Sequence, residues 1–279
     1  MKSKVTVAKY AGLCFGVKRA IDIAEQTCVG KNKIYTLGPL IHNPQEVERL
    51  SLKGIKKIKD ANKLNNSVLI LRTHGVPLGF KDKLRSKNLT LVDATCPFVK
   101  RAQDVIKELS KKNVWIVIVG EKSHPEVKAL VSYGKGKCIV VEKEGDLKKI
   151  KAEGSICVVS QTTQTSGYFN KVVRQIKKIN PNVNVYNTIC RATVDRQYAA
   201  KRIAKQVDIM LVIGGKNSGN TKRLAQICAK FAKTYYIETA AELKKKWLKN
   251  SKKIGITAGA STPGWIVSDI KMRIKKLLN

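Results

Sequence analysis

The sequence predicts an α/β fold in which three pseudo-repeated βαβ-type lobes, each with a small parallel sheet, surround one central site. The first observation is a repeated spacing. Cys14, Cys96 and Cys190 each lie 28 residues before a polar residue of a glycine-led loop, since 42 − 14, 124 − 96 and 218 − 190 are equal. Short apolar runs also alternate with segments of helical periodicity. Runs such as 114–119 are continuously apolar, which is typical of strands buried on both faces of a parallel sheet.

Each repeat begins with an extended run and a cysteine that opens an amphipathic helical pattern. The extended runs are 5–10, 89–95 and 183–189, and the helical patterns are 14–24, 96–106 and 190–200. The second strands are 33–37, 114–119 and 209–214, and they lead into the loops of His42, His124 and Ser218. The third segments are 68–77, 156–165 and 254–263, and their loops hold His74, Thr162 and Ser261.

This order predicts a βαβαβαβ unit followed by a helix, repeated in lobes 1–88, 89–182 and 183–279. The unit is too long for a solenoid turn and fits a compact α/β domain. Every polar loop follows a strand, and open parallel sheets bind ligands at the carboxyl ends of their strands. We therefore expect the three lobes to bring their loops to one cavity.

Composition indicates a cytoplasmic protein. The start MKSKVTVAKYAG lacks the apolar region of a signal peptide, and no stretch reaches the ~20 apolar residues of a membrane span. Seven cysteines without a CxxC pair point to a reducing compartment. We therefore expect no interaction with a membrane.

The net charge of +35 suggests nucleic-acid binding as one alternative. We favour a lysine-rich surface without a specific nucleic-acid partner, because the lysines are scattered over helical faces and do not alternate with aromatic residues. Such a charge still attracts an anionic substrate or an acidic electron-donor protein.

The three repeated cysteines are candidate metal ligands. The alternative is that they are small core residues, the usual role of a free cysteine. Their shared place between a strand and a helix argues against that role, because a helix N-terminus stabilises a thiolate. Zinc is a second alternative, but structural zinc prefers four ligands in close pairs. Three thiolates fit an iron–sulfur cluster with one iron open to a ligand.

Cys28, Cys138, Cys157 and Cys228 have no counterparts in the repeat, and we expect them to be structural.

His42, His74 and His124 are the only histidines, and all three lie in the predicted site loops. Imidazoles that donate hydrogen bonds suit a phosphate-rich ligand. The third repeat offers neutral donors instead, at Ser218, Asn220 and Ser261, and its GKNSGNT loop opens a helix that suits an anion.

Glu126 is the candidate proton donor, because reduction of a bound organic group consumes protons. The alternative is that it only complements the dipole of a helix start. Thr162 and Thr163 are candidates to orient or relay that proton, with helix capping as their alternative.

Nine motifs in order, from AGLCFGVKRAI through GPLIHNP, RTHGVP, DATCPFVK, HPEV, SQTT, NTICRATVDRQ and KNSGNT to TAGASTP, resemble the LytB-type 4-hydroxy-3-methylbut-2-enyl diphosphate reductases. The resemblance runs from Cys14 to Pro263. It implies a three-lobed α/β fold and the last step of the methylerythritol phosphate route to isoprenoids. In that step an allylic hydroxyl is removed reductively, which gives isopentenyl and dimethylallyl diphosphate.

The resemblance also implies residue roles. Cys14, Cys96 and Cys190 would hold one [4Fe–4S] cluster whose open iron binds the substrate hydroxyl. His42, His74, Ser218, Asn220 and Ser261 would hold the diphosphate. His124, Thr162 and Glu126 would lie near the hydroxyl, with Glu126 as the proton source. Electrons would come from reduced ferredoxin or flavodoxin.

The chain departs from the family pattern at three places. Gly219 stands where members usually have a second serine, which removes one donor to the diphosphate. KALVSYG follows HPEV where a small glycine-containing turn is usual, and the chain ends soon after its last helix.

A non-enzymatic iron–sulfur electron carrier or redox sensor is the alternative function. That alternative explains the cysteines but leaves the convergent His, Ser and Asn side chains without a role.

Overall fold

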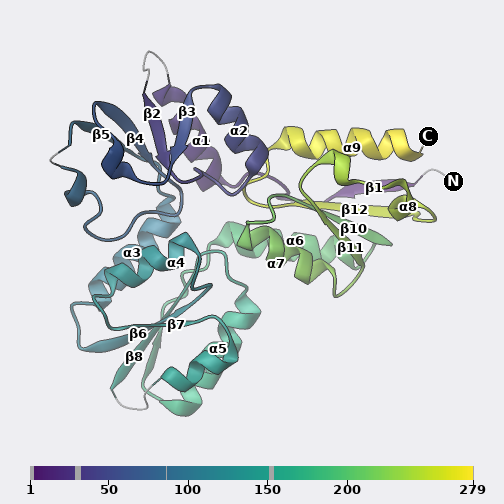
Figure 1. Cartoon of the computed structure of the whole chain (residues 1–279). Coiled ribbons are helices and arrows are strands. Elements are labelled where there is room, and N and C mark those ends of the chain that lie inside the picture. Colours follow the sequence, from purple (N-terminus) through teal and green to yellow (C-terminus); the bar gives the residue numbers. More distant parts are fainter. Residues whose placement is uncertain (1–2, 29–32, 86, 151–153, 279) are drawn as a thin grey trace. The chain divides into compact units, whose positions relative to one another are not determined.

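The computed structural model describes residues 3–28, 33–85, 87–150 and 154–278. Its twelve strands in these ranges form three four-stranded parallel sheets (Figure 1). The chain divides into two compact units. Unit 1 comprises Met1–Lys18, Ile41–Arg49 and Arg191–Asn279, and unit 2 comprises Arg19–Leu40 and Leu50–Cys190. No helix in the described ranges is both long enough and apolar enough to span a membrane.

The elements repeat in the predicted order. The first repeat contains β1 (Lys4–Val7), α1 (Phe15–Thr27), β2 (Ile34–Leu37), α2 (Pro44–Leu52), β3 (Ile55–Ile58), η1 (Ala61–Lys63), β4 (Ser67–Leu71) and η2 (Asp82–Leu84). The second contains β5 (Leu89–Asp93), α3 (Pro97–Leu109), β6 (Val114–Val119), α4 (Pro125–Tyr133), β7 (Cys138–Val141), η3 (Glu144–Lys149), β8 (Ser155–Ser160) and α5 (Ser166–Ile179). The third contains β9 (Val183–Val185), α6 (Arg191–Ala204), β10 (Ile209–Ile213), α7 (Gly219–Cys228), β11 (Lys233–Ile237), η4 (Ala240–Glu242), α8 (Lys245–Leu248), β12 (Lys253–Ala258) and α9 (Gly264–Leu278).

One difference from the predicted order recurs in every repeat. The helix before the last strand is a short 3-10 turn, η1, η3 or η4, and in the third repeat the short α8 follows it. These segments hold three to six residues, which is too short for a stable α-helical stretch.

The three sheets share one strand order. Their orders are β3-β2-β4-β5, β7-β6-β8-β9 and β11-β10-β12-β1. In each sheet the edge strand that leads to a cysteine pairs with the last strand of the preceding repeat, as β5 does with β4 and β9 with β8. The N-terminal strand β1 takes the same position beside β12, so the start of the chain completes the sheet of the third repeat. The lobe limits 1–88, 89–182 and 183–279 stay a prediction. They group each leading strand with the helix that follows it in the chain, whereas the sheets group it with the strand beside it.

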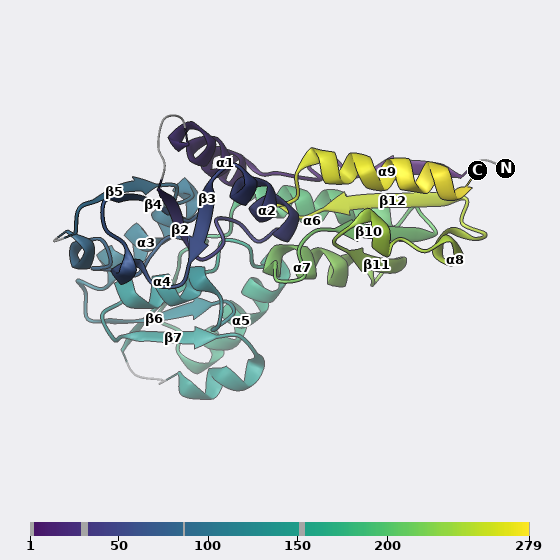
Figure 2. The same cartoon turned by 45° about the horizontal axis from the view of Figure 1, so that its top comes forward.

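The sheet of unit 1 is covered on both faces. Leu211, Ile254 and Ile256 pack with the buried residues of α9, whereas Met210 and Val212 pack with α6 and α7. Figure 2 shows α9 on one side of β12 and β10, with α6 and α7 on the other. Successive strand side chains point to opposite faces, so a strand buried on both must be apolar throughout.

The second sheet of unit 2 follows the same rule. Ile116 and Ile118 pack with α3 and α4, whereas Val117 and Val119 pack with α5. The predicted continuous apolar run 114–119 is therefore a central strand with helices on both faces. This burial fixes the strand, so the loop at its carboxyl end, 120–124, starts from a rigid point.

Candidate functional site

Every predicted site residue follows the carboxyl end of a parallel strand. Cys96, His74, His124, Thr162 and Cys190 follow β5, β4, β6, β8 and β9 of unit 2. Cys14, Ser218 and Ser261 follow β1, β10 and β12, and with His42 and Asn220 they belong to unit 1.

The centre of the group in unit 2 is a buried contact between Glu126 and Thr162. Glu126 is 1% exposed and lies in the first turn of α4. One carboxylate oxygen accepts the backbone N–H of Thr162 at 2.7 Å, and the other accepts the Thr162 hydroxyl at 2.9 Å. Both oxygens are therefore held by one residue, which fixes the plane of the carboxyl group.

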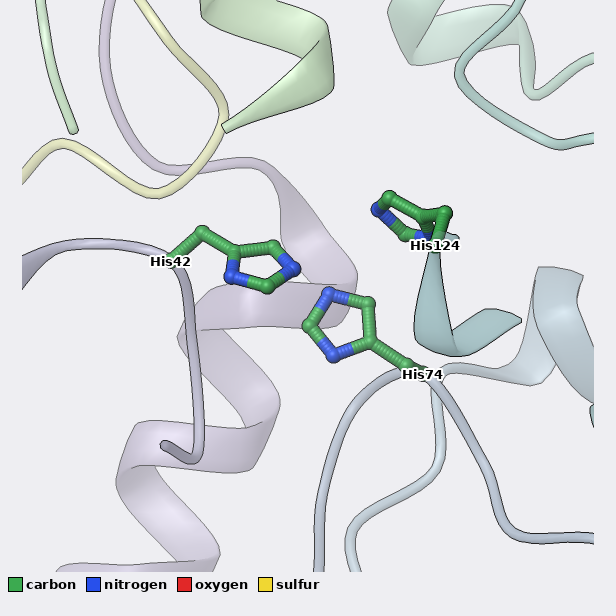
Figure 3. A group of neighbouring side chains, drawn as sticks. All are labelled: His42, His74 and His124. Carbon is green, nitrogen blue, oxygen red and sulfur yellow. The ribbon is translucent and has the colours of Figure 1, made fainter. Parts of the chain in front are cut away.

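His124 forms the N-cap of α4, directly before Pro125. Its Nδ1 accepts the backbone N–H of Glu126 at 3.2 Å. A neutral imidazole that accepts at Nδ1 carries its proton on Nε2, so Nε2 is the atom that donates to a ligand. The His124 and His74 rings meet edge to face, with centroids 5.3 Å apart and planes at 81° (Figure 3). Figure 3 also draws His42, which belongs to unit 1.

A hydrogen bond and an ion pair hold the loop that carries His124 in position. The Glu121 backbone N–H donates to Gln161 Oε1 at 3.1 Å, and the Gln161 side chain donates in turn to the Thr163 hydroxyl. Lys122 forms an ion pair with Asp146 of η3. Its ammonium group and two backbone N–H groups hold the pKa of the Asp146 carboxyl well below its usual range, against the opposing effect of burial. Gln161 lies in the SQTT motif, but neither its contact with Glu121 nor the pairing of Lys122 with Asp146 could be predicted from the sequence.

The three repeated cysteines have equivalent backbone contacts. The Cys96 N–H donates to the Thr73 carbonyl at 3.0 Å, Cys190 to Thr162 at 2.9 Å, and Cys14 to Ala260 at 3.0 Å. Each cysteine is thereby attached to the last polar loop of its own sheet. The contacts also set the register of these loops, because the residues that follow the three acceptors are His74, Thr163 and Ser261. Thr163 is therefore the structural counterpart of His74 and Ser261.

Each of these cysteines is half-buried and directly precedes the first turn of a helix. The Cys96 carbonyl accepts the N–H of Lys100, and the Cys14 carbonyl accepts that of Lys18, as expected at a helix start. The three thiols thus occupy equivalent positions, each directly before a helix N-terminus.

The other four cysteines have no counterparts in the repeat. Burial raises the pKa of Cys138 to about 11 and that of Cys228 to about 12. Burial also raises the pKa of Cys157 and, with a contribution from Glu25, that of Cys28. Their structural role stays a prediction.

In unit 1, three loops pack closely around His42. The Ser261 hydroxyl donates to the His42 carbonyl at 3.0 Å. On the other side Gly215 approaches so closely that a Cβ there would lie 2.5 Å from the same carbonyl oxygen. A side chain at position 215 would push this loop away, so glycine is required for the two loops to meet.

Asn220 is the least satisfied polar side chain of this group. It lies in the first turn of α7 and is 5% exposed. Among the residues that the structure describes, neither its Oδ1 nor its Nδ2 has a hydrogen-bond partner. Buried amides are normally paired, so this side chain indicates a ligand at the N-terminus of α7. A helix N-terminus is also a favourable place for an anion.

Thr221 orients Ser218, and sequence reasoning missed it. Ser218 is the N-cap of α7, and its Oγ accepts the Thr221 N–H at 3.3 Å and the Thr221 hydroxyl at 3.0 Å. With both acceptor positions used, the Ser218 hydroxyl offers its own proton to a ligand. Thr221 is completely buried, and Gly259 leaves it room, because a Cβ there would lie 2.0 Å from Thr221 Oγ1.

Comparisons with known proteins agree on one family. Residues 5–275 match the family model described as LytB protein. The chain is 45% identical to the 4-hydroxy-3-methylbut-2-enyl diphosphate reductase of Trichlorobacter lovleyi over 277 residues, 99% of both chains. It is 44% identical to the reductase of the same name from Aquifex aeolicus, over 98% of this chain and 96% of the relative.

Two solved structures are also similar. One is a reductase described as the terminal enzyme of the non-mevalonate pathway, with 43% identity, a TM-score of 0.73 and coverage of 99% of this chain and 100% of that one. The other is the E-1-hydroxy-2-methyl-but-2-enyl-4-diphosphate reductase of Plasmodium falciparum, with 27% identity, a TM-score of 0.93 and coverage of 100% and 89%. The chain therefore belongs to the LytB family of 4-hydroxy-3-methylbut-2-enyl diphosphate reductases.

Proposed function

We propose that this chain reduces 4-hydroxy-3-methylbut-2-enyl diphosphate to isopentenyl diphosphate and dimethylallyl diphosphate. The allylic C–O bond breaks, two electrons and one proton pass to the carbon skeleton, and a second proton leaves with the hydroxyl as water. The observation that carries the proposal is the Glu126–Thr162 contact, because the same Thr162 accepts the N–H of Cys190 through its carbonyl. Thr162 thus connects a buried carboxyl group to the backbone of a candidate metal ligand.

Cys14, Cys96 and Cys190 are the residues that would hold one [4Fe–4S] cluster. Their equivalent backbone contacts and their shared place at helix starts support this assignment. When bound, a three-cysteine cluster supplies electrons and one open iron that acts as a Lewis acid toward the substrate hydroxyl.

His42, His74, Ser218, Asn220 and Ser261 are the proposed diphosphate ligands. Two observations support the part of this assignment that lies in unit 1. The Asn220 amide has no hydrogen-bond partner among the described residues. The Ser218 oxygen already accepts two hydrogen bonds from Thr221, so its proton is directed to a ligand. A diphosphate offers several acceptor oxygens, so donor groups at the N-terminus of α7 suit it. Gly219 adds no hydroxyl, and its backbone N–H is the group left to donate at that position.

Glu126, His124 and Thr162 are the proposed proton-handling residues. Glu126 would carry the proton, Thr162 would hold the carboxyl group in place, and His124 would donate from Nε2. The electrons would come singly from reduced ferredoxin or flavodoxin. We place the protein in a reducing cytoplasm, because its seven cysteines include no CxxC pair.

The test of the function is the anaerobic oxidation of reduced methyl viologen by the reconstituted protein. We expect rapid oxidation only when the allylic hydroxy-diphosphate is present, with both five-carbon diphosphates as products. A brown protein that oxidises viologen at the same rate without the diphosphate would instead be the electron carrier or redox sensor. That alternative gives no role to the unpaired amide of Asn220.

Replacement of Thr221 by valine should weaken diphosphate binding without unfolding α7. Valine lacks the Thr221 hydroxyl that donates to Ser218, so the Ser218 proton is no longer directed to the ligand. The loss of a hydrogen bond worth about 1 kcal/mol corresponds to a roughly fivefold increase in the Kd for the diphosphate. The measurement is calorimetric titration with inorganic pyrophosphate. Thr257→Val is the matched control, because the Thr257 hydroxyl is fully buried without a partner among the described residues. An equal Kd for both variants would remove Thr221 from the binding mechanism, whereas Thr221→Ser should bind like the parent.

A further inference from the structure

One face of α6 in unit 1 combines exposed apolar and basic side chains. Val194 is 38% exposed and Tyr198 is 69% exposed. Lys201, Arg202 and Lys205 are exposed further along the same stripe. Tyr198, Lys201 and Arg202 lie four, seven and eight residues after Val194, which places these four residues on one side of the helix. Lys205 follows directly after the last residue of α6, Ala204. We call these five residues, together with Phe231, the α6 surface.

Phe231 extends this surface beyond the helix. It is 41% exposed, and the ammonium groups of Lys201 and Lys205 lie 5.5 and 5.4 Å from the centre of its ring. Two lysines over one aromatic ring place positive charge beside an apolar patch. Aromatic residues and arginine surrounded by charged groups are the composition typical of a protein interface.

The opposite face of α6 is fixed to unit 1. Ala199, Ala200 and Ile203 are buried against the sheet. Arg196 is 2% exposed and donates to the backbone carbonyl of Tyr10 in the loop that leads to Cys14. The α6 surface is therefore presented by a rigid helix, so it needs no rearrangement to receive a partner.

The place of this surface follows from the cysteine that precedes it. α6 begins at Arg191, directly after Cys190, and Tyr198 lies about 12 Å further along the helix at 1.5 Å per residue. The proposed reaction takes up two electrons from outside the protein, and they must enter close to the metal ligands. A protein that covers Val194 and Tyr198 would lie within about 12 Å of Cys190 along the helix axis.

The charge of the surface selects the kind of partner. Within α6 the one acidic residue is Asp195, and it forms an ion pair with Arg191 at 3.8 Å. Lys201, Arg202 and Lys205 therefore give the surface a net positive charge. We infer that the α6 surface is the docking site for a small acidic one-electron carrier protein, which delivers the two electrons in successive encounters. This inference rests on the proposed reductase function.

Such encounters are small and short-lived, and opposite charges raise their association rate. The basic rim would bring the acidic carrier to the surface, and the apolar centre would bring the two proteins into contact. Two properties of the protein can therefore be measured independently. One is binding of the carrier protein, and the other is turnover with a small reduced dye that needs no docking site.

The test is a charge reversal at two positions, K201E/R202E, in the reconstituted protein. The matched control is K275E/K276E on α9, which changes the net charge equally at exposed residues of the same unit. The probe is a purified acidic [2Fe–2S] ferredoxin. We expect the α6 variant to raise its Kd by calorimetry, and its KM in turnover, about tenfold at low salt. The control should change both by less than twofold, and the difference should shrink as salt is added.

The viologen assay distinguishes the two claims. The α6 variant should oxidise reduced viologen at the parental rate in the presence of substrate, because its chemistry is unaffected. Y198S, which keeps the charge, should raise the ferredoxin Kd by at least threefold. Equal effects of the α6 and α9 reversals, or an unchanged Kd in both α6 variants, would overturn the docking site. If the parent protein shows no substrate-dependent viologen oxidation, the proposed function fails, while the Kd comparison still decides the docking site.

Discussion

Replacement of Cys96 by serine is expected to abolish both the brown colour of the reconstituted protein and its substrate-dependent viologen oxidation. Iron–sulfur clusters are held by thiolates, and a serine hydroxyl keeps its proton at neutral pH. The Cys96 backbone N–H would still donate to Thr73, so the loop geometry would be preserved while the ligand atom is lost. The measurements are iron and sulfide per chain, visible absorbance and anaerobic turnover.

Cys28→Ser is the matched control for this prediction. Cys28 is a half-buried free thiol without a counterpart in the repeat, and burial raises its pKa. Its replacement should leave four irons per chain and a normal rate. A colourless parent protein with one tightly bound zinc would contradict the iron–sulfur assignment. So would a Cys96→Ser variant that keeps its full iron content.

The sequence predicted the order of elements well because the repeated spacing and the apolar runs are local signals. The run 114–119 had to be a strand buried on both faces, and the structure places helices on both sides of it. The placement of polar loops after strands followed directly. His42, His124 and Ser218 all lie beyond the carboxyl ends of strands, as the repeat predicted.

The assignment of strands to sheets could not be predicted in the same way. The segments around β1, β5 and β9 read as the first strands of their repeats, yet each pairs with the last strand of another repeat. A pattern of apolar residues indicates that a strand is buried but carries no information about which strand lies beside it. The consequence for the site is large, because this exchange places Cys96 next to Thr73 and Cys190 next to Thr162.

The supporting residues of the site also lay beyond sequence reasoning. Gln161 and Lys122 act through contacts with Glu121 and Asp146, which a residue pattern does not reveal. Thr221 ends the KNSGNT motif, but only its two hydrogen bonds to Ser218 assign it a role. A motif places such residues near the site, whereas the packing of the folded chain defines which of them hold the others in position.

Replacement of Glu126 by glutamine is expected to lower the rate of turnover by at least about a hundredfold, the usual contribution of a positioned proton donor. The glutamine oxygen can accept the Thr162 N–H as the carboxylate does. The Thr162 hydroxyl can rotate to accept from the new amide group. The shape of the site is therefore kept, while the group that carries a proton is lost. Iron content and substrate affinity should remain at the parental level.

The control is Glu121→Gln, which removes the same charge five residues earlier, in the loop that precedes α4. Its backbone N–H still donates to Gln161, so the loop stays attached, and turnover should be normal. The rival role for Glu126 is to complement the dipole at the first turn of α4. That role predicts a loss of about 0.3–1 kcal/mol in the free energy of unfolding and an unchanged rate. Measurement of both quantities on one variant decides between them, because a proton donor affects the rate far more than the stability.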